Sequence, residues 1–253
     1  MTQAPLDGTF RRAWQLLARN WVIIVPALVV GVITGAVLYL LDAYGAISVG
    51  SLDELNGGGP AAFTAFIGSI VAILVRIVGA IVSIAYTTGM AAAAWKRGSA
   101  TLADGTAAFR ADAGQIFIAM LLLFLLGLIA ATFMDFTYYT TLLLYAIFVL
   151  YTMPAVIVGQ RSGVDALVES FRIAGKNFWT TLGVVVLIGL IAAAGGIVAE
   201  LVHDFPLLGQ IVALVLMEAV VAYATLVVVG EYIALRPTLD RPAEDVPPPP
   251  AAS

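Results

Sequence analysis

Apolar and polar positions follow a helical period from Ser162 to Trp179, immediately before a long run without charge. One side of this stretch is apolar and repeats at three- and four-residue steps: Val164, Leu167, Val168, Phe171, Ala174 and Phe178. The opposite side is polar: Asp165, Glu169, Arg172 and Lys176. The pattern predicts an amphipathic helix, with Ser162 and Asp165 placed as a capping box at its start. The following uncharged run is long enough to cross ~30 Å of hydrocarbon.

The same order, an amphipathic segment followed by long apolar runs, occurs three times in the chain. Interfacial helices are predicted at about residues 7–20, at 101–115 and from Ser162 onward. Six apolar runs are predicted to span the membrane: from Trp21 to about Leu41, within Ala61–Trp95, twice within Ile116–Gln160, from Thr180 to near Glu200, and from Leu207 to Leu235. Three polar stretches are predicted to connect them: Asp42–Pro60, a turn around Asp135–Tyr139, and His203–Pro206.

An alignment without gaps supports an internal repeat. The segment WQLLARNW at 14–21 matches FRIAGKNF at 171–178, which places Arg19 on Lys176 and Asn20 on Asn177. The middle segment, FRADAGQI at 109–116, is degenerate, with Gln115 at the asparagine position. We therefore predict an all-α polytopic membrane protein of three hairpin repeats (about 7–98, 99–161 and 162–236), each preceded by a cytoplasmic amphipathic interfacial helix. This single transmembrane domain covers residues 1–236, and residues 237–253 are predicted to form a disordered, Pro-rich cytoplasmic tail.

The second apolar run is too long for one upright span. Its 35 residues would form a helix of ~52 Å. Counting back from Lys96 places Arg76 at the far interface. Ala61–Val75 then either extends span two or forms a separate interfacial segment, and the sequence leaves these alternatives open.

Composition agrees with the membrane assignment: 62% of the residues are hydrophobic and 11% are charged, with a mean hydropathy of +1.03. A soluble domain carries roughly 25% charged residues, so a soluble fold is excluded. The chain has no cysteine and one histidine, which excludes thiolate chemistry and leaves little scope for a zinc site. Catalytic motifs are absent, so we expect no enzyme activity, no cofactor, no metal and no nucleic-acid partner.

Charge predicts the orientation. Of the 12 lysine and arginine residues, all but Arg76 lie near the predicted interfacial helices, at the adjoining span ends or in the tail. The positive-inside rule then places both termini and the three interfacial helices in the cytoplasm.

Charges within or beside the spans are the first candidates for function, namely Arg76, Glu200 and Glu218. Glu218 lies 17 residues before Leu235, or ~25 Å along a helix, which is close to the depth of Arg76. An Arg76–Glu218 pair would offset the desolvation of both groups. The alternative, which we favour, is that each side chain reaches the outer headgroups and does nothing further. Glu231, one turn before Arg236, is interpreted as a residue of the cytoplasmic rim.

The repeated corners are the second candidates. Arg19, Asn20 and Trp21, with Lys176, Asn177 and Trp179, could contact lipid headgroups through a basic residue and an interfacial aromatic ring. The simpler interpretation, which we favour, is a structural corner in which the asparagine caps the span.

The motif at these corners, an aromatic residue, four residues, Arg or Lys, Asn and a second aromatic residue, resembles a loose group of bacterial integral membrane proteins. They include the membrane domain found beside some glycerophosphoryl diester phosphodiesterases and similar uncharacterised six-span families. ALVESFRIAGKNFW at 166–179 is the most typical part, and the resemblance extends to about Arg236. It implies a multi-pass protein of the bacterial inner membrane. The phosphodiesterase activity belongs to a separate catalytic barrel and is not carried over.

Two functions follow from these observations. The first is a non-enzymatic membrane scaffold or lipid-environment module that meets anionic headgroups, with any protein partner unspecified. The alternative is a transporter of a small solute or lipid that uses Arg76 and Glu218.

Overall fold

The computed structural model describes residues 6–43, 60–133, 140–203 and 208–239, and within these ranges every regular element is a helix. Six of the described helices are long and apolar enough to cross a membrane: Trp21–Ala43, Ile67–Arg97, Leu102–Thr132, Thr140–Ile157, Phe178–Val202 and Ile211–Leu235. The predicted number of spans is thus confirmed for the described residues. The chain is an integral, multi-pass membrane protein.

The first part of the chain contains α1 (Leu6–Arg19), the 3₁₀ helix η1 (Trp21–Ile24), α2 (Val25–Ala43) and α4 (Pro60–Arg97). The middle part contains α5 (Leu102–Thr132), α7 (Thr140–Val149) and α8 (Thr152–Ile157). The last part contains α9 (Gly163–Lys176), α10 (Phe178–His203), α11 (Leu208–Leu235) and the 3₁₀ helix η2 (Arg236–Leu239). Residues 44–59, 134–139 and 204–207, which hold most of the predicted connections, lie outside the described residues. His203 ends α10 rather than beginning a turn, and η2 carries ordered structure to Leu239, beyond the predicted boundary of the tail.

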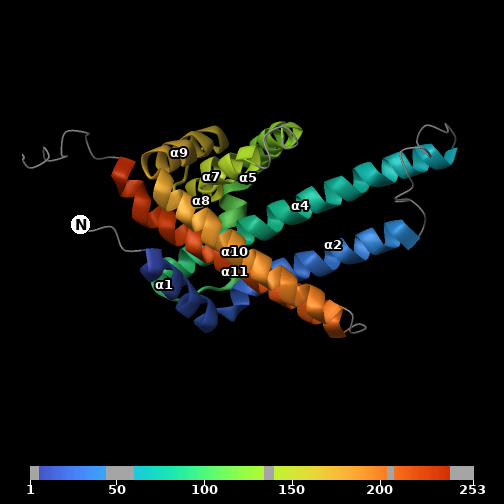
Figure 1. Ribbon diagram of the computed structural model, residues 1–253, viewed down its shortest axis with the longest axis horizontal. Coiled ribbons are helices and arrows are strands. Elements are labelled where there is room, and N and C mark those ends of the chain that lie inside the picture. Colours follow the sequence, from blue (N-terminus) through green and yellow to red (C-terminus); the bar gives the residue numbers. More distant parts are fainter. Residues whose placement is uncertain (1–5, 44–59, 134–139, 204–207, 240–253) are drawn as a thin grey trace, which may run out of the picture.

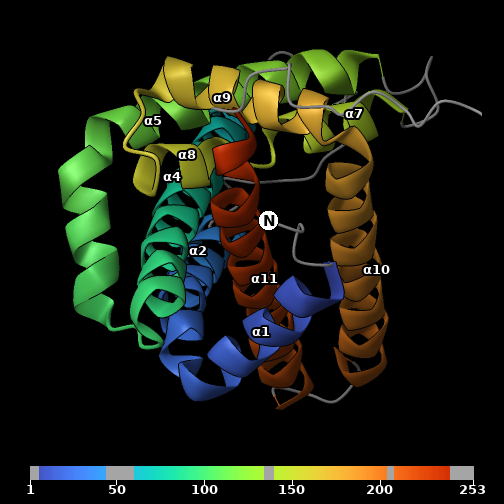
Figure 2. The same cartoon turned by 90° about the vertical axis from the view of Figure 1, so that its left-hand side faces the viewer.

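The long helices form two pairs, α2 with α4 and α10 with α11, which cross near the end of the molecule where α1 and α9 lie (Figure 1). α4 packs along α2, and α10 packs along α11, with α11 also contacting α4; Figure 1 shows the two pairs diverging from the end where α1 and α9 lie. Seen from that end, α11 lies between α1 and α9, with α10 to one side (Figure 2). Two clusters of buried apolar side chains, one around α1, α4 and α11 and one around α5, α8 and α9, hold this end together.

The long second run forms one helix. α4 is continuous over 38 residues from Pro60 to Arg97, and Figure 1 shows it as a single extended ribbon. Ala61–Val75 is therefore the N-terminal part of the helix that forms span two, and of the two alternatives the separate interfacial segment is wrong.

The α9 helix buries part of its polar side and exposes part of its apolar side. Its buried residues include Ala166, Glu169, Ser170 and Ile173, whereas three residues of the apolar side are exposed: Val164, Val168 and Phe171. Part of the apolar side thus faces away from the protein, where a helix at the interface contacts lipid, while Ala174 of the same side is buried. Glu169, on the polar side of the pattern, is buried because its carboxylate pairs with Arg161 and Arg236.

Two glycines of α9 provide a matched test of its packing. A Cβ on Gly163 would lie 2.8 Å from the backbone nitrogen of Ala119, whereas a Cβ on Gly175 meets nothing within 4 Å. We expect Gly163→Ala to lower the free energy of unfolding by about 1–2 kcal/mol through overpacking against α5. Gly175→Ala is expected to raise it by about 0.5 kcal/mol, since alanine loses less conformational entropy in a helix. SDS-induced unfolding in mixed micelles measures both; equal effects would contradict the close α5–α9 approach.

Candidate functional site

Both predicted asparagine corners have the same backbone conformation. Asn20, between α1 and η1, has φ −127° and ψ 51°, and Asn177, between α9 and α10, has φ −124° and ψ 41°. Each side-chain amide donates to the carbonyl four residues earlier, Asn20 to Leu16 at 2.9 Å and Asn177 to Ile173 at 3.1 Å. In the middle part, α5 bends at Asp112, with φ −123° and ψ 16°, three residues before the aligned Gln115. Both asparagines therefore end the preceding helix in the same way.

Asn20 also links the end of α1 to the residues that follow α4 through side-chain hydrogen bonds. Its Nδ2 donates to the Gly98 carbonyl at 3.1 Å, and its Oδ1 accepts from the Ala100 backbone N–H at 2.9 Å. Gly98 follows α4 with φ +79°, a left-handed conformation that glycine adopts without strain. Asn20 is 6% exposed and does not cap the next helix through its side chain. The prediction of a side-chain cap is thus wrong for Asn20, because its polar atoms are used by the α4–α5 connection.

The other predicted headgroup contacts lie on the surface. Arg19 and Lys176 are exposed, and Trp21 and Trp179 are 69% and 79% exposed, while Asn177 is partly buried. Lys176 Nζ also donates to the Leu239 carbonyl at 3.4 Å. A basic residue and an exposed tryptophan therefore stand at each of these two corners. Asn20 is the member of the predicted set that lies inside the protein.

The intramembrane charges do not form the considered pair. The side chains of Arg76 in α4 and Glu200 in α10 are exposed. Glu218 is half-buried and faces α2, since a Cβ on Gly31 would lie 3.1 Å from its Oε1. The ion pairs among the described residues join Arg97 to Asp104, Arg161 to Glu169 and Arg236 to Glu169. Arg76, Glu200 and Glu218 are thus not brought together.

Glu169 is the centre of a buried polar cluster. Its Oε2 accepts from Arg161 Nε at 2.6 Å, and its Oε1 accepts from the Tyr232 hydroxyl at 2.6 Å and lies 3.4 Å from Arg236 Nε. The carboxylate is 6% exposed, and its bond to Arg161 raises the pKa of that guanidinium. Gln160 turns the chain with φ +56°, a strained value outside glycine, to bring Arg161 into place. Glu169 thus joins α9 to the end of α11.

The fourth span is broken in the middle, which the sequence interpretation did not anticipate. α7 ends at Val149 and α8 begins at Thr152. Ser170 of α9 bridges the break, because its Oγ donates to the Phe148 carbonyl at 2.7 Å and accepts from the Tyr151 N–H at 3.1 Å. Such side chains satisfy the backbone groups that a broken membrane helix frees.

Glu231 of α11 lies inside the protein rather than at its rim. Its side chain is 3% exposed and lies close to Thr9 of α1. Its Oε1 and the Thr152 hydroxyl are buried oxygens without a hydrogen-bond partner in the described part of the chain. The rim assignment of Glu231 is therefore wrong, because α1 folds over this part of α11.

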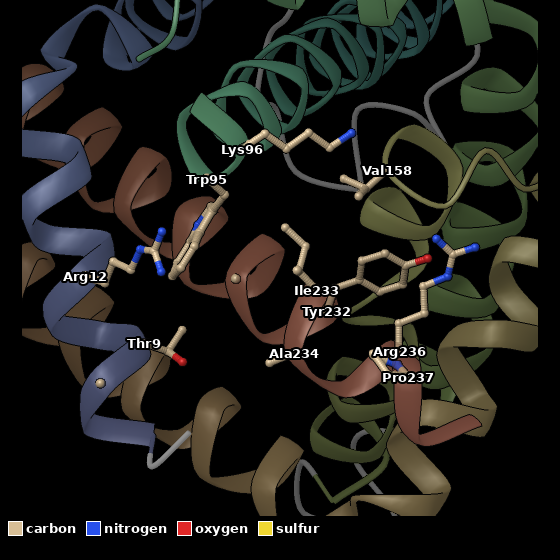
Figure 3. Close-up of a pocket in the computed structure, with 12 residues that line it drawn as sticks. Thr9, Arg12, Trp95, Lys96, Val158, Tyr232, Ile233, Ala234, Arg236 and Pro237 are labelled. Atoms are coloured by element: carbon tan, nitrogen blue, oxygen red, sulfur yellow. The ribbon is translucent and has the colours of Figure 1, made fainter. Parts of the chain in front are cut away.

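A cavity of about 660 Å³ opens between α1, the C-terminal end of α4 and the C-terminal end of α11. Three basic residues from separate elements line it, Arg12, Lys96 and Arg236. Figure 3 shows Arg12 on the Trp95 side and Arg236 on the Tyr232 side, with Lys96 reaching over the space between them. Its other lining residues are mainly apolar or small: Gly8, Thr9, Trp95, Val158, Gly230, Tyr232, Ile233, Ala234 and Pro237. The arrangement suits an anion attached to an apolar group.

Sequence reasoning missed this cavity for a simple reason. The three basic residues are far apart in the chain, and they line one cavity only once α1, α4 and α11 are packed together. The available signal was that all three flank span ends on the same predicted side. Charge therefore identified the correct end of the protein, but the shared cavity required the tertiary structure.

Comparisons with protein-family models, with curated proteins and with solved structures yield no match for this chain. The resemblance to the phosphodiesterase-associated membrane domain stays a prediction, and the proposals below rest on the geometry.

Proposed function

We propose that the protein is a non-enzymatic membrane scaffold or lipid-environment module that engages anionic lipid through the end of the molecule where α1 and α9 lie. The observation that carries this proposal is the pairing of exposed basic residues with exposed tryptophans at the corners. Trp14, Trp21 and Trp179 are 64%, 69% and 79% exposed, and Arg19 and Lys176 are exposed beside them. Tryptophan favours the membrane–water interface, and basic residues near it attract anionic headgroups.

The location proposed is the bacterial inner membrane, with both termini, α1, the first turns of α5, and α9 on the cytoplasmic side. The support is the charge distribution: apart from Arg76, the described lysine and arginine residues lie in or next to α1, α9 and the span ends near them. The anionic surface of the cytoplasmic leaflet would attract this end. The three hairpin repeats remain part of the proposal, supported by the matching backbone at Asn20 and Asn177.

Fluorescence quenching in proteoliposomes tests the proposed function. Comparing tryptophan quenching by brominated phosphatidylglycerol with quenching by brominated phosphatidylcholine gives the lipid preference around the exposed tryptophans. For the parent protein we expect a preference of roughly threefold for phosphatidylglycerol, and added salt should lower this preference. The double variant Arg19→Gln, Lys176→Gln should bring this preference close to one. Arg76→Gln removes one positive charge from an exposed arginine remote from the corners and is the control for each single variant, Arg19→Gln and Lys176→Gln. A double variant that keeps the full preference would count against the proposal.

Transport of a small solute or lipid is the second candidate. The broken α7–α8 span and the buried Glu231 favour it, because interrupted helices and buried charges form the sites of many transporters. The charges named from the sequence do not favour it: a cavity of about 430 Å³ between α2 and α4 is lined by apolar residues and Thr34, with Arg76 outside its lining. Uptake or lipid flip by the same proteoliposomes, lost in Glu231→Gln, would replace the scaffold proposal by this one.

A further inference from the structure

We propose that the cavity between α1, α4 and α11 binds one phospholipid molecule, whose phosphate group is bound by basic residues of the cavity lining. This inference rests on the proposed contact with anionic lipid, and it adds a defined site to a general surface attraction. The site is separate from the predicted headgroup contacts at the Asn20 and Asn177 corners, none of which lines the cavity.

The lining of the cavity carries a net positive charge, which favours an anionic ligand. None of the described residues that line it is acidic, whereas three are basic. Arg236 is partly neutralised by Glu169, but that carboxylate also holds Arg161 at 2.6 Å, so this cluster keeps a positive charge. Glu231 is buried close to Thr9 and is not among the described residues that line the cavity. Even if Glu169 and Glu231 are both ionised, the four cations Arg12, Lys96, Arg161 and Arg236 leave a net positive charge at the cavity. A cavity lined by three cations attracts an anion, which lowers the repulsion among them.

Two of the cations are positioned before any ligand arrives. The guanidinium of Arg12 lies 4.8 Å from the centre of the Trp95 ring, and Trp95 is itself held by a 2.8 Å bond from Nε1 to the Leu226 carbonyl. Gly230 makes this wall possible, because a Cβ there would overlap the Trp95 ring. Arg236 is held by Glu169 and by the Gly159 carbonyl, 3.4 Å from Nη2. Guanidinium groups fixed in this way suit phosphate, which they can bind through paired N–H donors.

The walls indicate an amphiphile rather than free phosphate. Apart from the cations and Thr9, the lining consists of aromatic, aliphatic and glycine residues, and at about 660 Å³ the cavity is far larger than a phosphate ion. The exposed Trp14 of α1 and the apolar side of α9 are expected to place this end at the interface, where phospholipids are the abundant phosphate-bearing molecules. A phospholipid would place its phosphate on the cations and its glycerol and first methylenes along Val158, Ile233 and Pro237.

Native mass spectrometry of the full chain in detergent, titrated with dioleoylphosphatidylglycerol, tests the proposal. We expect the parent protein to retain one lipid molecule. Arg12→Gln and Lys96→Gln should each weaken its retention by about fivefold, the effect of losing roughly one basic residue near an anionic lipid. Lys96→Arg keeps the charge and should restore binding. Both glutamine variants leave the Glu169 cluster intact, and an unchanged thermal transition will show that they fold.

Arg110→Gln and Arg172→Gln are the matched controls, because each removes an exposed positive charge outside the cavity and outside the two corners; each should change retention by less than about twofold. Unchanged retention in both cavity variants overturns the proposal, as does an equal loss in the controls. An excess of sn-glycerol 3-phosphate should leave the lipid bound, and displacement would show that a soluble phosphate ester is the ligand instead. Suppose that Arg12→Gln and Lys96→Gln retain lipid as the parent does, while the double variant Arg19→Gln, Lys176→Gln loses the phosphatidylglycerol preference in vesicles. The proposed function then stands without this site.

Discussion

Replacing Glu169 by alanine is expected to lower the free energy of unfolding by about 3 kcal/mol, the largest loss predicted for a single side chain of this protein. The carboxylate is buried, forms ion pairs with Arg161 and Arg236, and accepts a hydrogen bond from the Tyr232 hydroxyl. The two arginines are partly exposed and can return to water, but the hydroxyl of the fully buried Tyr232 would lose its acceptor. Its orphaned O–H adds to the lost packing between α9 and α11. SDS-induced unfolding of the reconstituted protein measures the loss.

Two variants separate the charge of Glu169 from its shape. Glu169→Gln keeps a carbonyl acceptor for Tyr232 and should cost about half as much, since charged hydrogen bonds are roughly twice as strong as neutral ones. Glu200→Gln removes a carboxylate that is exposed on α10 and should have almost no effect. If Glu169→Ala were as stable as Glu200→Gln, the cluster would not hold α9 to α11.

The second largest loss is expected for Asn20→Ala, at about 2–3 kcal/mol. The variant removes the bonds to the Leu16 and Gly98 carbonyls and leaves the buried Ala100 N–H without an acceptor. An unpaired buried N–H alone costs about 1–3 kcal/mol. The loss should be independent of lipid headgroup, because Asn20 contacts protein rather than lipid. The same unfolding measurement, repeated in phosphatidylcholine and phosphatidylglycerol bicelles, tests both statements.

Asn177→Ala is the natural partner experiment, since the alignment places Asn177 on Asn20. Asn177 is less buried, and its side chain donates to Ile173 within the preceding helix. We expect a smaller loss, about 1 kcal/mol. Equal losses at the two positions would mean that the link from Asn20 to residues 98–100 adds nothing beyond the corner itself.

The spans were predictable because a membrane imposes a length and an apolar composition on each of them. The corners were also predictable, because Asn20 and Asn177 repeat within the same local sequence. What the sequence did not reveal depends on contacts between distant segments. The pattern placed Glu169 on a polar side, but polarity does not say whether the partner of a charge is water or, as here, Arg161 and Tyr232.

The break after Val149 depends on one local and one distant residue. Pro154 has no N–H to donate to the carbonyl of Leu150, four residues earlier, which is a local signal of the interruption that the sequence interpretation did not use. Ser170, 19 residues after Tyr151, supplies a donor and an acceptor to the freed backbone, and the local pattern does not show this contact. The cavity likewise needs Arg12, Lys96 and Arg236 to line one space, which local periodicity cannot show.

The length of α4 sets a condition on the bilayer that holds this protein. Thirty-eight residues make a helix of ~57 Å, against a hydrocarbon thickness of ~30 Å. A tilt of roughly 40°, the upper limit observed for membrane helices, still leaves about 44 Å along the normal. Ile67 and Ile70, both exposed, lie in the part that extends beyond an average bilayer even at this tilt. Lipid must thicken around this end to cover them, so the protein should fit thick, ordered membrane regions at a lower elastic cost than thin ones.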